Sequence, residues 1–386
     1  MRTQVAIIGG GPAGLLLGHL LRQAGISAVV IERQTRQHVL SRIRAGVLER
    51  TTTDLLRRLG IDARLNAEGL PHDGFSLADG ERLIHIDIAG LTGHRVTVYG
   101  QTELTRDLVD AAPGRGLEIV WGSPVTAIRE LESERAIVEH GEGQTIECDF
   151  VAGCDGFHGP ARQAIPEKIR RVFERAYPFG WLGVLAEVAP CHEELIYASH
   201  ERGFALASMR SQTRSRYYVQ VPLTDEVAAW PDDRFWEEVG LRLGPEAAGN
   251  ITRGPSVEKS IAPLRSFVSE PVQYARLFLA GDAAHIVPPT GAKGLNLASS
   301  DVAYLSDALI CFYRTGDREA LAGYGAKALA RVWKAERFSW YLTKLMHRFP
   351  DDGPFERRMQ MAELDYIAQS PAMQTAIAEN YVGLPL

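Results

Sequence analysis

The sequence predicts an α/β protein with a Rossmann-like nucleotide-binding domain, an antiparallel-sheet domain and a C-terminal helical region. Three observations indicate this class. The chain opens on an apolar run, a glycine-rich turn, a helical pattern and a second apolar run between Val5 and Glu32. Four runs of alternating residues lie between Phe179 and Val221. The stretch Leu321–Leu386 carries Trp, Phe, Tyr and Met at helical spacing.

The composition is that of a globular protein with two or three domains. The chain has 386 residues, of which 45% are hydrophobic and 23% charged. A net charge of -6 argues against a nucleic-acid-binding surface, and no apolar run approaches the roughly 20 residues of a membrane span. Because the first strand starts at the N-terminus and leaves no room for a signal peptide, we expect a cytoplasmic protein. The four cysteines form no C-x-x-C pair, which favours free thiols over disulfides or a metal site.

The glycine-rich turn is typical of a dinucleotide site. Gly9, Gly11 and Gly14 fill the glycine positions of G-x-G-x-x-G, which serve a tight turn, the approach of the backbone to a pyrophosphate, and helix packing. The amides of the following helix face that pyrophosphate. Glu32 follows at about the 20-residue spacing of an acid that binds a ribose hydroxyl. The fingerprint leaves open whether the ligand is FAD or NAD(P).

The segment 33–60 is predicted to form helical turns with a basic outer face. Arg42 and Arg44 follow the ribose acid closely enough to reach a phosphate of the dinucleotide. We expect a helix with a polar cap over 101–111, a strand meander over 117–153 that ends in a turn at Asp155, and a new helical segment after it. His72 by itself is expected to be an ordinary surface or core residue.

The four alternating runs predict an antiparallel sheet. Residues two apart on a strand point the same way, so Ser208 and Arg210 share one face, and Arg216, Tyr218 and Gln220 share another. These faces line a cavity in one interpretation and form the solvated side of a half-buried sheet in the other.

A second dense stretch lies between Arg276 and Leu309. A buried strand leads to Asp282, which is placed to bind a ribose or ribityl hydroxyl, and a helix starts near Gly294, where its N-terminus can face an anionic ring. Two such turns far apart in the chain indicate one extended ligand held at both ends. The last segment, from Leu321, is predicted to be a helical cap or a subunit interface.

Three motifs together resemble the single-component flavoprotein aromatic hydroxylases over essentially the whole chain. They are GGGPAG with Glu32, CDG followed by FHGPARQ, and AGDAAHIVPPTGAKGLNLA. The resemblance implies FAD as cofactor, NADPH as co-substrate, and O2 that reacts through a flavin C4a-hydroperoxide. Four further segments, YPFGWLG, GFALASMRSQTRSRYYVQVPL, KSIAPLRSF and WKAERFSW, resemble members that convert 4-hydroxybenzoate to 3,4-dihydroxybenzoate. We expect a homodimer.

The resemblance also implies which residues bind the two nucleotides. Those expected to hold FAD are Gly9, Gly11, Gly14, Glu32, Arg42, Arg44, Gln101, Asp155, Arg216, Asp282, Lys293, Gly294, Leu295 and Asn296. Those expected to hold NADPH are Arg33, Gln34, His38, His158, Arg162 and Arg265. Arg216 matches a residue that supports movement of the flavin ring. His38 lies where the family varies, so the preference for NADPH or NADH stays open.

By the same resemblance, the aromatic substrate lies on the sheet. Its carboxylate is expected between Arg210, Ser208 and Tyr218, and its phenol near Tyr197, the Pro289 carbonyl and Thr290. Tyr381 would extend a hydrogen-bond chain from Tyr197, and His72 would release the proton to solvent.

The expected FAD-binding domain comprises residues 1–71, 97–178 and 264–310, the substrate domain 72–96 and 179–263, and the helical region 311–386. Two alternatives remain open. One is a monooxygenase of this fold that acts on another phenolic acid, such as 3-hydroxybenzoate or 2-hydroxybenzoate. The other is a non-catalytic binding protein of the same fold.

Overall fold

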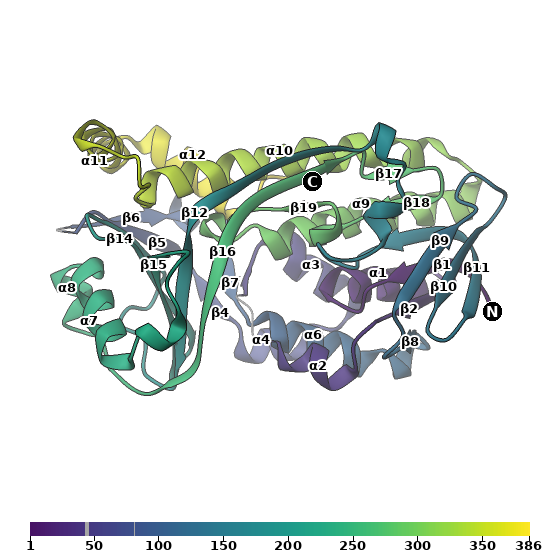
Figure 1. Cartoon of the computed structure of the whole chain (residues 1–386), viewed down its shortest axis with the longest axis horizontal. Coiled ribbons are helices and arrows are strands. Elements are labelled where there is room, and N and C mark those ends of the chain that lie inside the picture. Colours follow the sequence, from purple (N-terminus) through teal and green to yellow (C-terminus); the bar gives the residue numbers. More distant parts are fainter. Residues whose placement is uncertain (43–45, 81) are drawn as a thin grey trace.

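The computed structural model describes residues 1–42, 46–80 and 82–386, so the predicted phosphate ligand Arg44 lies outside the described residues. Figure 1 shows an elongated molecule with a β-sheet at each end. Two long antiparallel strands, β12 (Arg171–Ala186) and β16 (Ser256–Glu270), run between the ends. Helix α10 (Glu319–Met346) lies along the same direction.

The first sheet contains the βαβ unit that the glycine pattern predicts. Its central strands are β1 (Arg2–Ile8), β2 (Ala28–Ile31) and β11 (Gln144–Gly153), and α1 (Pro12–Gln23) connects β1 to β2. β1 pairs in parallel with both neighbours. The outer strands are β8 (Glu118–Val120), β9 (Val125–Arg129), β10 (Ala136–His140), β17 (Gln273–Tyr274) and β18 (Leu277–Leu279). The order is β17-β18-β11-β1-β2-β8, and β10 and β9 extend from β11.

The second sheet confirms the antiparallel arrangement of the four alternating runs. Besides β12 and β16 it contains β5 (Gly74–Ala78), β6 (Leu83–Asp87), β13 (Ile196–His200), β14 (Gly203–Ser211), β15 (Arg214–Pro222) and β19 (His285–Ile286). The order is β19-β16-β12-β15-β14-β13-β5-β6. A third, small sheet joins β3 (Val47–Leu48), β7 (Val96–Val98) and β4 (Leu70–His72) in that order.

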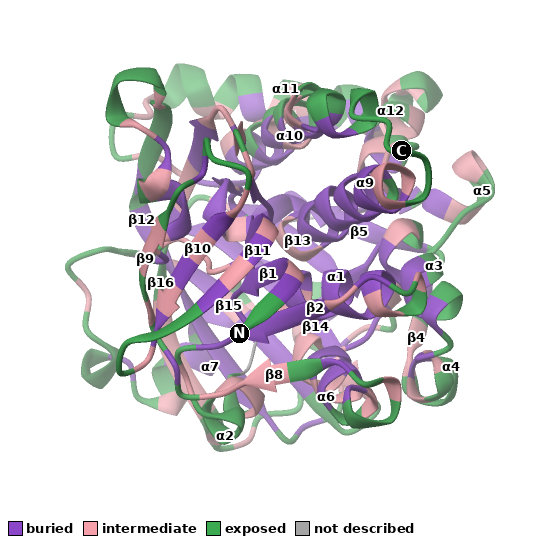
Figure 2. Cartoon of the chain, turned by 90° about the vertical axis from the view of Figure 1, so that its right-hand side faces the viewer, coloured by how far each residue is buried: buried purple, intermediate pink, exposed green. Residues whose placement is uncertain are grey.

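Helices cover both sheets. They include α2 (Arg36–Ser41), α3 (Arg50–Leu59), α4 (Ala63–Glu68), α5 (Ile88–Thr92), α6 (Gln101–Ala111), α7 (Asp232–Leu243), α8 (Pro245–Ala248), α9 (Gly294–Thr315), α11 (Pro354–Gln369) and α12 (Pro371–Val382). Figure 2 shows β1, α1 and α9 as largely buried elements of the first core. The predicted C-terminal helical region is confirmed, with breaks around Pro350 and Pro354. Among the described residues, no helix combines the length and apolar character that crossing a membrane requires.

Four local predictions were wrong. β12 begins at Arg171, well before the predicted run, because its exposed first half pairs with β16. β8 pairs in parallel with β2 and stands outside the meander. The segment after Asp155 forms only a short 3₁₀ turn, Ala161–Ala164, since nearby prolines limit helix extension. The cap of α6 is Gly100, which offers no side-chain bond.

Candidate active site

The glycines of the turn between β1 and α1 have different surroundings. Gly9 has a φ of +107°, and a methyl group there would lie 2.3 Å from the Cys154 carbonyl oxygen. A methyl group on Gly14 would lie 2.0 Å from the Gly9 carbonyl oxygen, whereas one on Gly11 would meet nothing within 4 Å. Gly11 is also the N-cap of α1, and no side chain caps this helix. The turn therefore presents helix amides to open space of the kind that suits a pyrophosphate.

Glu32 is buried at the end of β2. One carboxylate oxygen accepts a hydrogen bond from the Gly10 amide at 2.6 Å, and the other accepts one from the Gln34 amide at 2.8 Å. These bonds fix the carboxylate beside the glycine turn. Each oxygen retains a second lone pair, so the group can still accept a hydrogen bond from a hydroxyl.

A cavity of about 390 Å³ lies beside the turn that follows β11. It brings together residues predicted for different ligands and from distant parts of the chain. From the predicted FAD set it is lined by Arg42, Asp155 and Asp282, from the NADPH set by Arg33, His158 and Arg265, and from the substrate set by Pro289.

Asp155 presents an incompletely bonded carboxylate at this cavity. Its Oδ2 accepts a hydrogen bond from the Ala161 amide at 2.8 Å, while its Oδ1 is buried without a partner among the described residues. Burial raises the pKa of Asp155 to about 6. An unpaired buried oxygen is costly, so this position suits a ligand hydroxyl.

Helix α9 fixes the second predicted nucleotide-binding turn, the one that carries Asp282. The Asp301 carboxylate accepts hydrogen bonds from the Gly281 amide at 2.9 Å and from His285 Nε2 at 2.6 Å. Burial lowers the pKa of His285, but the adjacent Asp301 carboxylate outweighs burial and the pKa is raised. This buried pair fixes the backbone from which Asp282 projects.

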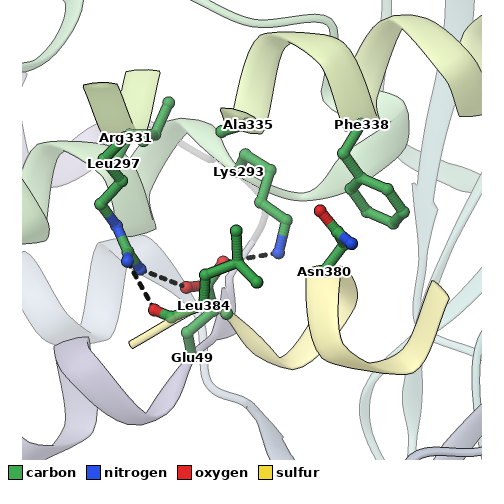
Figure 3. A pocket seen from close by; sticks show the side chains of 9 residues that line it. Glu49, Lys293, Leu297, Arg331, Ala335, Phe338, Asn380 and Leu384 are labelled. Carbon is green, nitrogen blue, oxygen red and sulfur yellow. Dashed lines mark hydrogen bonds and ion pairs between the residues drawn. The ribbon is translucent and has the colours of Figure 1, made fainter. Parts of the chain in front are cut away.

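The start of α9 combines an open N-terminus with a buried charge cluster. No side chain caps the helix, and a methyl group on Gly294 would meet nothing within 4 Å. The Lys293 side chain lies in this cluster: its Nζ donates to Glu49 Oε1 at 2.6 Å (Figure 3) and also to the Tyr381 carbonyl oxygen at 2.8 Å. Burial lowers the pKa of Lys293. The Asn296 side chain bonds to the Glu49 amide and to the Val47 and Ala292 carbonyl oxygens.

The strand register places the predicted polar residues of β14 and β15 on one face. Ser208 pairs with Arg216, and Leu206 pairs with Tyr218, so the side chains of each pair point the same way. A bulge between Met209 and Ser211 leaves Arg210 close to Ser208, and the guanidinium donates to the Ser208 hydroxyl at 3.2 Å. Arg210 Nε is buried and has no partner among the described residues.

Two small residues, Gly183 and Ser208, lie beside Arg210 and Tyr218 on this face of the sheet. A methyl group on Gly183 of β12 would lie 2.7 Å from the Tyr218 ring, so only glycine leaves that ring its place. Ser208 is buried. Burial lowers the pKa of Arg210, which nevertheless remains a cation at any physiological pH. A half-buried cation whose Nε is buried and unpaired is a site for an anion such as a carboxylate.

Tyr197 and Tyr381 meet at the far edge of the same face. Their hydroxyl oxygens lie 2.9 Å apart, and both side chains are buried. Phe75 stacks on the Tyr381 ring with centroids 4.1 Å apart. Burial raises the pKa of Tyr197 to about 12 and raises that of Tyr381 as well. Both phenols therefore stay neutral near pH 7 and can relay a proton without losing one.

His72 is buried on β4 and contacts β14. Its Nε2 lies 3.2 Å from Met209 Sδ, and its Nδ1 has no partner among the described residues. Burial lowers the pKa of His72. The described residues show no hydrogen bond from this imidazole to either tyrosine, so its predicted place at the end of the proton path stays a prediction.

Two arginines predicted to bind nucleotides are engaged within the protein. Arg216 forms a bidentate pair with Glu258, with nitrogen-to-oxygen distances of 2.6 and 3.3 Å. Arg162 is buried and donates to the Ala283 and Phe157 carbonyl oxygens at 2.9 and 2.7 Å. Arg162 thereby fixes the backbone of Phe157, which lines the cavity. The remaining predicted residues do not line it: Thr290 is buried against Thr343, Gln101 begins α6, Leu295 lies in the first turn of α9, and His38 is exposed on α2.

Sequence reasoning missed the acids that hold the site together. Glu49 binds Lys293 and Glu258 binds Arg216, two residues that it had selected, and Asp301 binds the backbone of the turn that carries Asp282. Arg331 and Phe75 were missed as well. The sequence carries no local signal for these residues, because their partners are remote along the chain.

The elements just described define a class of protein: the FAD-binding aromatic hydroxylase fold, with a mixed sheet around the glycine-rich turn, a second sheet and a helical C-terminal region. Two solved structures share it at the level of fold. p-Nitrophenol 4-monooxygenase PnpA from Pseudomonas putida DLL-E4 aligns with a TM-score of 0.84 at 19% identity, covering 100% of both chains. PqsL from P. aeruginosa, in complex with 2-aminobenzoylacetate, gives 0.83 at 21% identity, covering 95% of this chain and 100% of that chain.

The sequence comparisons give the family. The family described as FAD binding domain matches residues 2–339. The p-hydroxybenzoate hydroxylase of Acinetobacter baylyi (strain ATCC 33305 / BD413 / ADP1) is 55% identical over 388 positions, covering 100% of this chain and 96% of the relative. The chain belongs to the p-hydroxybenzoate hydroxylase family of FAD-dependent aromatic hydroxylases.

Proposed function

We propose that this protein is a 4-hydroxybenzoate 3-monooxygenase that uses FAD, NADPH and O2 to form 3,4-dihydroxybenzoate. One observation carries the substrate: a single sheet face presents Arg210, with an unpaired buried Nε, near one end and the hydroxyl pair of Tyr197 and Tyr381 near the other. A para-substituted phenolic acid has a carboxylate and a phenol at opposite ends and matches this arrangement.

The carboxylate end orients the substrate. Arg210 supplies a charge-assisted donor, and Ser208 and Tyr218 are placed to donate beside it. Bound FAD supplies the activated oxygen. The open space at Gly11, the uncapped starts of α1 and α9, and the unpaired Asp155 oxygen support a dinucleotide with an anionic ring held between these elements.

The phenol end moves a proton. Loss of the phenol proton makes the ring carbon beside it more nucleophilic, which favours attack on activated oxygen. Tyr197 is placed to accept a hydrogen bond from the substrate phenol, and the proton can pass on to Tyr381 across 2.9 Å. Their burial keeps bulk water away while the proton leaves. We place His72 as the next acceptor on this path.

The glycines of the first turn give a matched pair of tests for FAD binding. Gly11→Ala should leave the apoprotein as stable as the parent, because its methyl group meets no protein atom, yet weaken FAD binding about tenfold or more by intruding on the pyrophosphate. Gly14→Ala should instead lower the free energy of unfolding by about 1–3 kcal/mol or prevent folding. Thermal unfolding of apoprotein and FAD titration separate the two. Parent-like FAD affinity in Gly11→Ala would place the pyrophosphate elsewhere.

We propose that Arg33 and His38 read the 2′-phosphate of NADPH. Arg33 lines the cavity, and His38 is exposed on the adjacent helix. His38→Glu would set a carboxylate against the phosphate and should lower the ratio of kcat/KM for NADPH over NADH about tenfold or more. Gln37→Glu, the same charge change one residue away, should lower it much less. A parent that prefers NADH, or equal effects of the two variants, would remove this segment from phosphate recognition.

The flavin absorbance spectrum tests the function directly. The purified protein should show bound flavin, and 4-hydroxybenzoate should perturb its spectrum and stimulate NADPH oxidation with formation of 3,4-dihydroxybenzoate. Stronger stimulation by 3-hydroxybenzoate or 2-hydroxybenzoate than by 4-hydroxybenzoate would indicate that the substrate is a different phenolic acid. A colourless protein that takes up no FAD would indicate a binding protein of this fold.

We also propose a cytoplasmic homodimer. Support comes from exposed apolar side chains at the start of β12 and on α10. Phe173 and Trp333 are 45% and 41% exposed, and their ring centroids lie 5.4 Å apart. Such a cluster is typical of an interface, and the mass in solution at micromolar concentration tests it.

A further inference from the structure

Three buried charges lie together behind the start of α9. Glu49 accepts from Lys293 Nζ at 2.6 Å through Oε1 and lies 3.4 Å from Arg331 through Oε2 (Figure 3). All three side chains are at most 10% exposed. One carboxylate facing two buried cations is an uncommon arrangement, because burial disfavours each charge unless it is paired and hydrogen-bonded.

The second cation has further partners, in the segment that follows α12. Arg331 Nη1 donates to the Leu384 carbonyl oxygen at 2.5 Å and to the Pro385 carbonyl oxygen at 3.0 Å. Gly383 has a φ of +99°, and a methyl group there would lie 2.0 Å from Glu49 Oε2. The segment 383–386 is therefore pressed against the carboxylate and tied to the guanidinium.

The same cluster reaches the phenol end of the site. Lys293 Nζ donates to the Tyr381 carbonyl oxygen at 2.8 Å. This carbonyl lies in the last turn of α12, where a helix has no intrahelical donors left for its carbonyl groups. The hydroxyl of the same residue bonds to Tyr197. The position of that hydroxyl thus depends on how firmly the end of α12 is held.

We propose that Arg331 is a positioning residue for the hydroxylation reaction. It clamps the segment 383–386 onto Glu49 and so fixes the end of α12, which keeps the Tyr381 hydroxyl against Tyr197. The inference rests on the proposed function, in which these two tyrosines carry the phenol proton. Arginine suits the task because its planar fork serves two carbonyl groups and a carboxylate at once, which a lysine ammonium cannot do in the same geometry.

The clamp is tested first by hydrogen exchange of the holoenzyme without substrate. In Arg331→Met, the amides of residues 381–384 and of Leu386 should exchange about tenfold or more faster than in the parent, because bonds from a charged donor are lost. Arg331→Lys should not restore protection. Lys334→Met is the matched control, since Lys334 is an exposed cation one turn further along α10, and it should exchange like the parent. Parent-like protection in Arg331→Met overturns the clamp.

The consequence for the reaction is tested by absorbance titration of the phenol of bound 4-hydroxybenzoate. Its apparent pKa should rise towards that of the free phenol in Arg331→Met, with more hydrogen peroxide released per NADPH, while flavin content is unchanged. Gly383→Ala displaces the same segment without touching Arg331 and should shift the titration the same way; it also serves if Arg331→Met fails to fold. Tyr381→Phe distinguishes a failure of the inference about Arg331 from a failure of the proposed proton path. A shift in Tyr381→Phe without one in Arg331→Met or Gly383→Ala overturns the inference alone, and no shift in Tyr381→Phe overturns the proposed proton path with it.

Discussion

Arg210→Ala should weaken the binding of 4-hydroxybenzoate about a hundredfold or more, which corresponds to about 3 kcal/mol. The cation sits on the sheet face with a buried, unpaired Nε, and its loss leaves the substrate carboxylate without its charged partner in a poorly hydrated corner. Flavin content should be unchanged, because Arg210 is not among the described residues that line the cavity beside Asp155. The dissociation constant is measured by titrating the flavin spectrum with substrate.

A neighbouring arginine supplies the control. Arg214 begins β15 and pairs with Glu187 at the surface, with Nε 3.0 Å from Oε1. Exposed pairs of this kind contribute roughly 0–1 kcal/mol, so Arg214→Ala should leave substrate affinity close to that of the parent. If Arg210→Ala binds 4-hydroxybenzoate as tightly as the parent, the carboxylate lies elsewhere. If both variants lose affinity equally, the loss reflects the removal of a positive charge in general and not a specific contact with the substrate carboxylate.

The nucleotide side of the fold was predictable because its signals are local. Gly9 and Gly14 are constrained by atoms of the βαβ unit and of the turn after β11, and Gly11 lies open at the start of α1, so the pattern of the three glycines carries the geometry with it. The same holds for the strand, turn and helix around Asp282. Constraints within one such unit determine residue type and spacing, so they can be recognised in the sequence.

The substrate side was predictable only in part, because faces follow from alternation but pairing does not. Alternation assigned Ser208 and Arg216 to faces of separate strands, and only the register of β14 against β15 shows that they point the same way. Alternation did place Arg210 on the face of Ser208, but the bulge between Met209 and Ser211 could not be predicted from the sequence. Alternation also missed the exposed first half of β12, which forms a strand because β16 pairs with it.

The charges behind the site could not be predicted at all. Glu49 binds Lys293 across 244 positions of sequence, and no periodicity links an acid to a base at that separation. Burial explains these pairs, because a buried cation needs an acceptor. Polar residues that sequence analysis treats as solvated therefore become fixed partners when the fold brings them together. Arg216 shows the same effect, since its partner Glu258 lies on another strand.

Tyr197→Phe should uncouple the reaction. The ring would keep its edge-on contact with Phe75, at 5.6 Å between centroids, so the substrate should still bind and still stimulate oxidation of NADPH. The lost hydroxyl leaves Tyr381 with no bonded neighbour on this side and the substrate phenol with no path for its proton. The phenol then stays protonated, its ring is a weaker nucleophile, and O2 is reduced without hydroxylation. Product per NADPH should fall and hydrogen peroxide should rise.

Tyr217→Phe is the matched control for this result, because Tyr217 is equally buried but its hydroxyl accepts from the Cys191 amide in a different core. That variant should cost stability and leave the yield of product per NADPH unchanged. Since burial raises the pKa of Tyr197 to about 12, its own ionisation cannot set the pH dependence of coupling between pH 6 and 9. Any change in coupling over that range must come from other groups, among them the substrate phenol and Asp155, whose pKa burial raises to about 6. Full coupling in Tyr197→Phe at every pH would take this tyrosine out of the proton path.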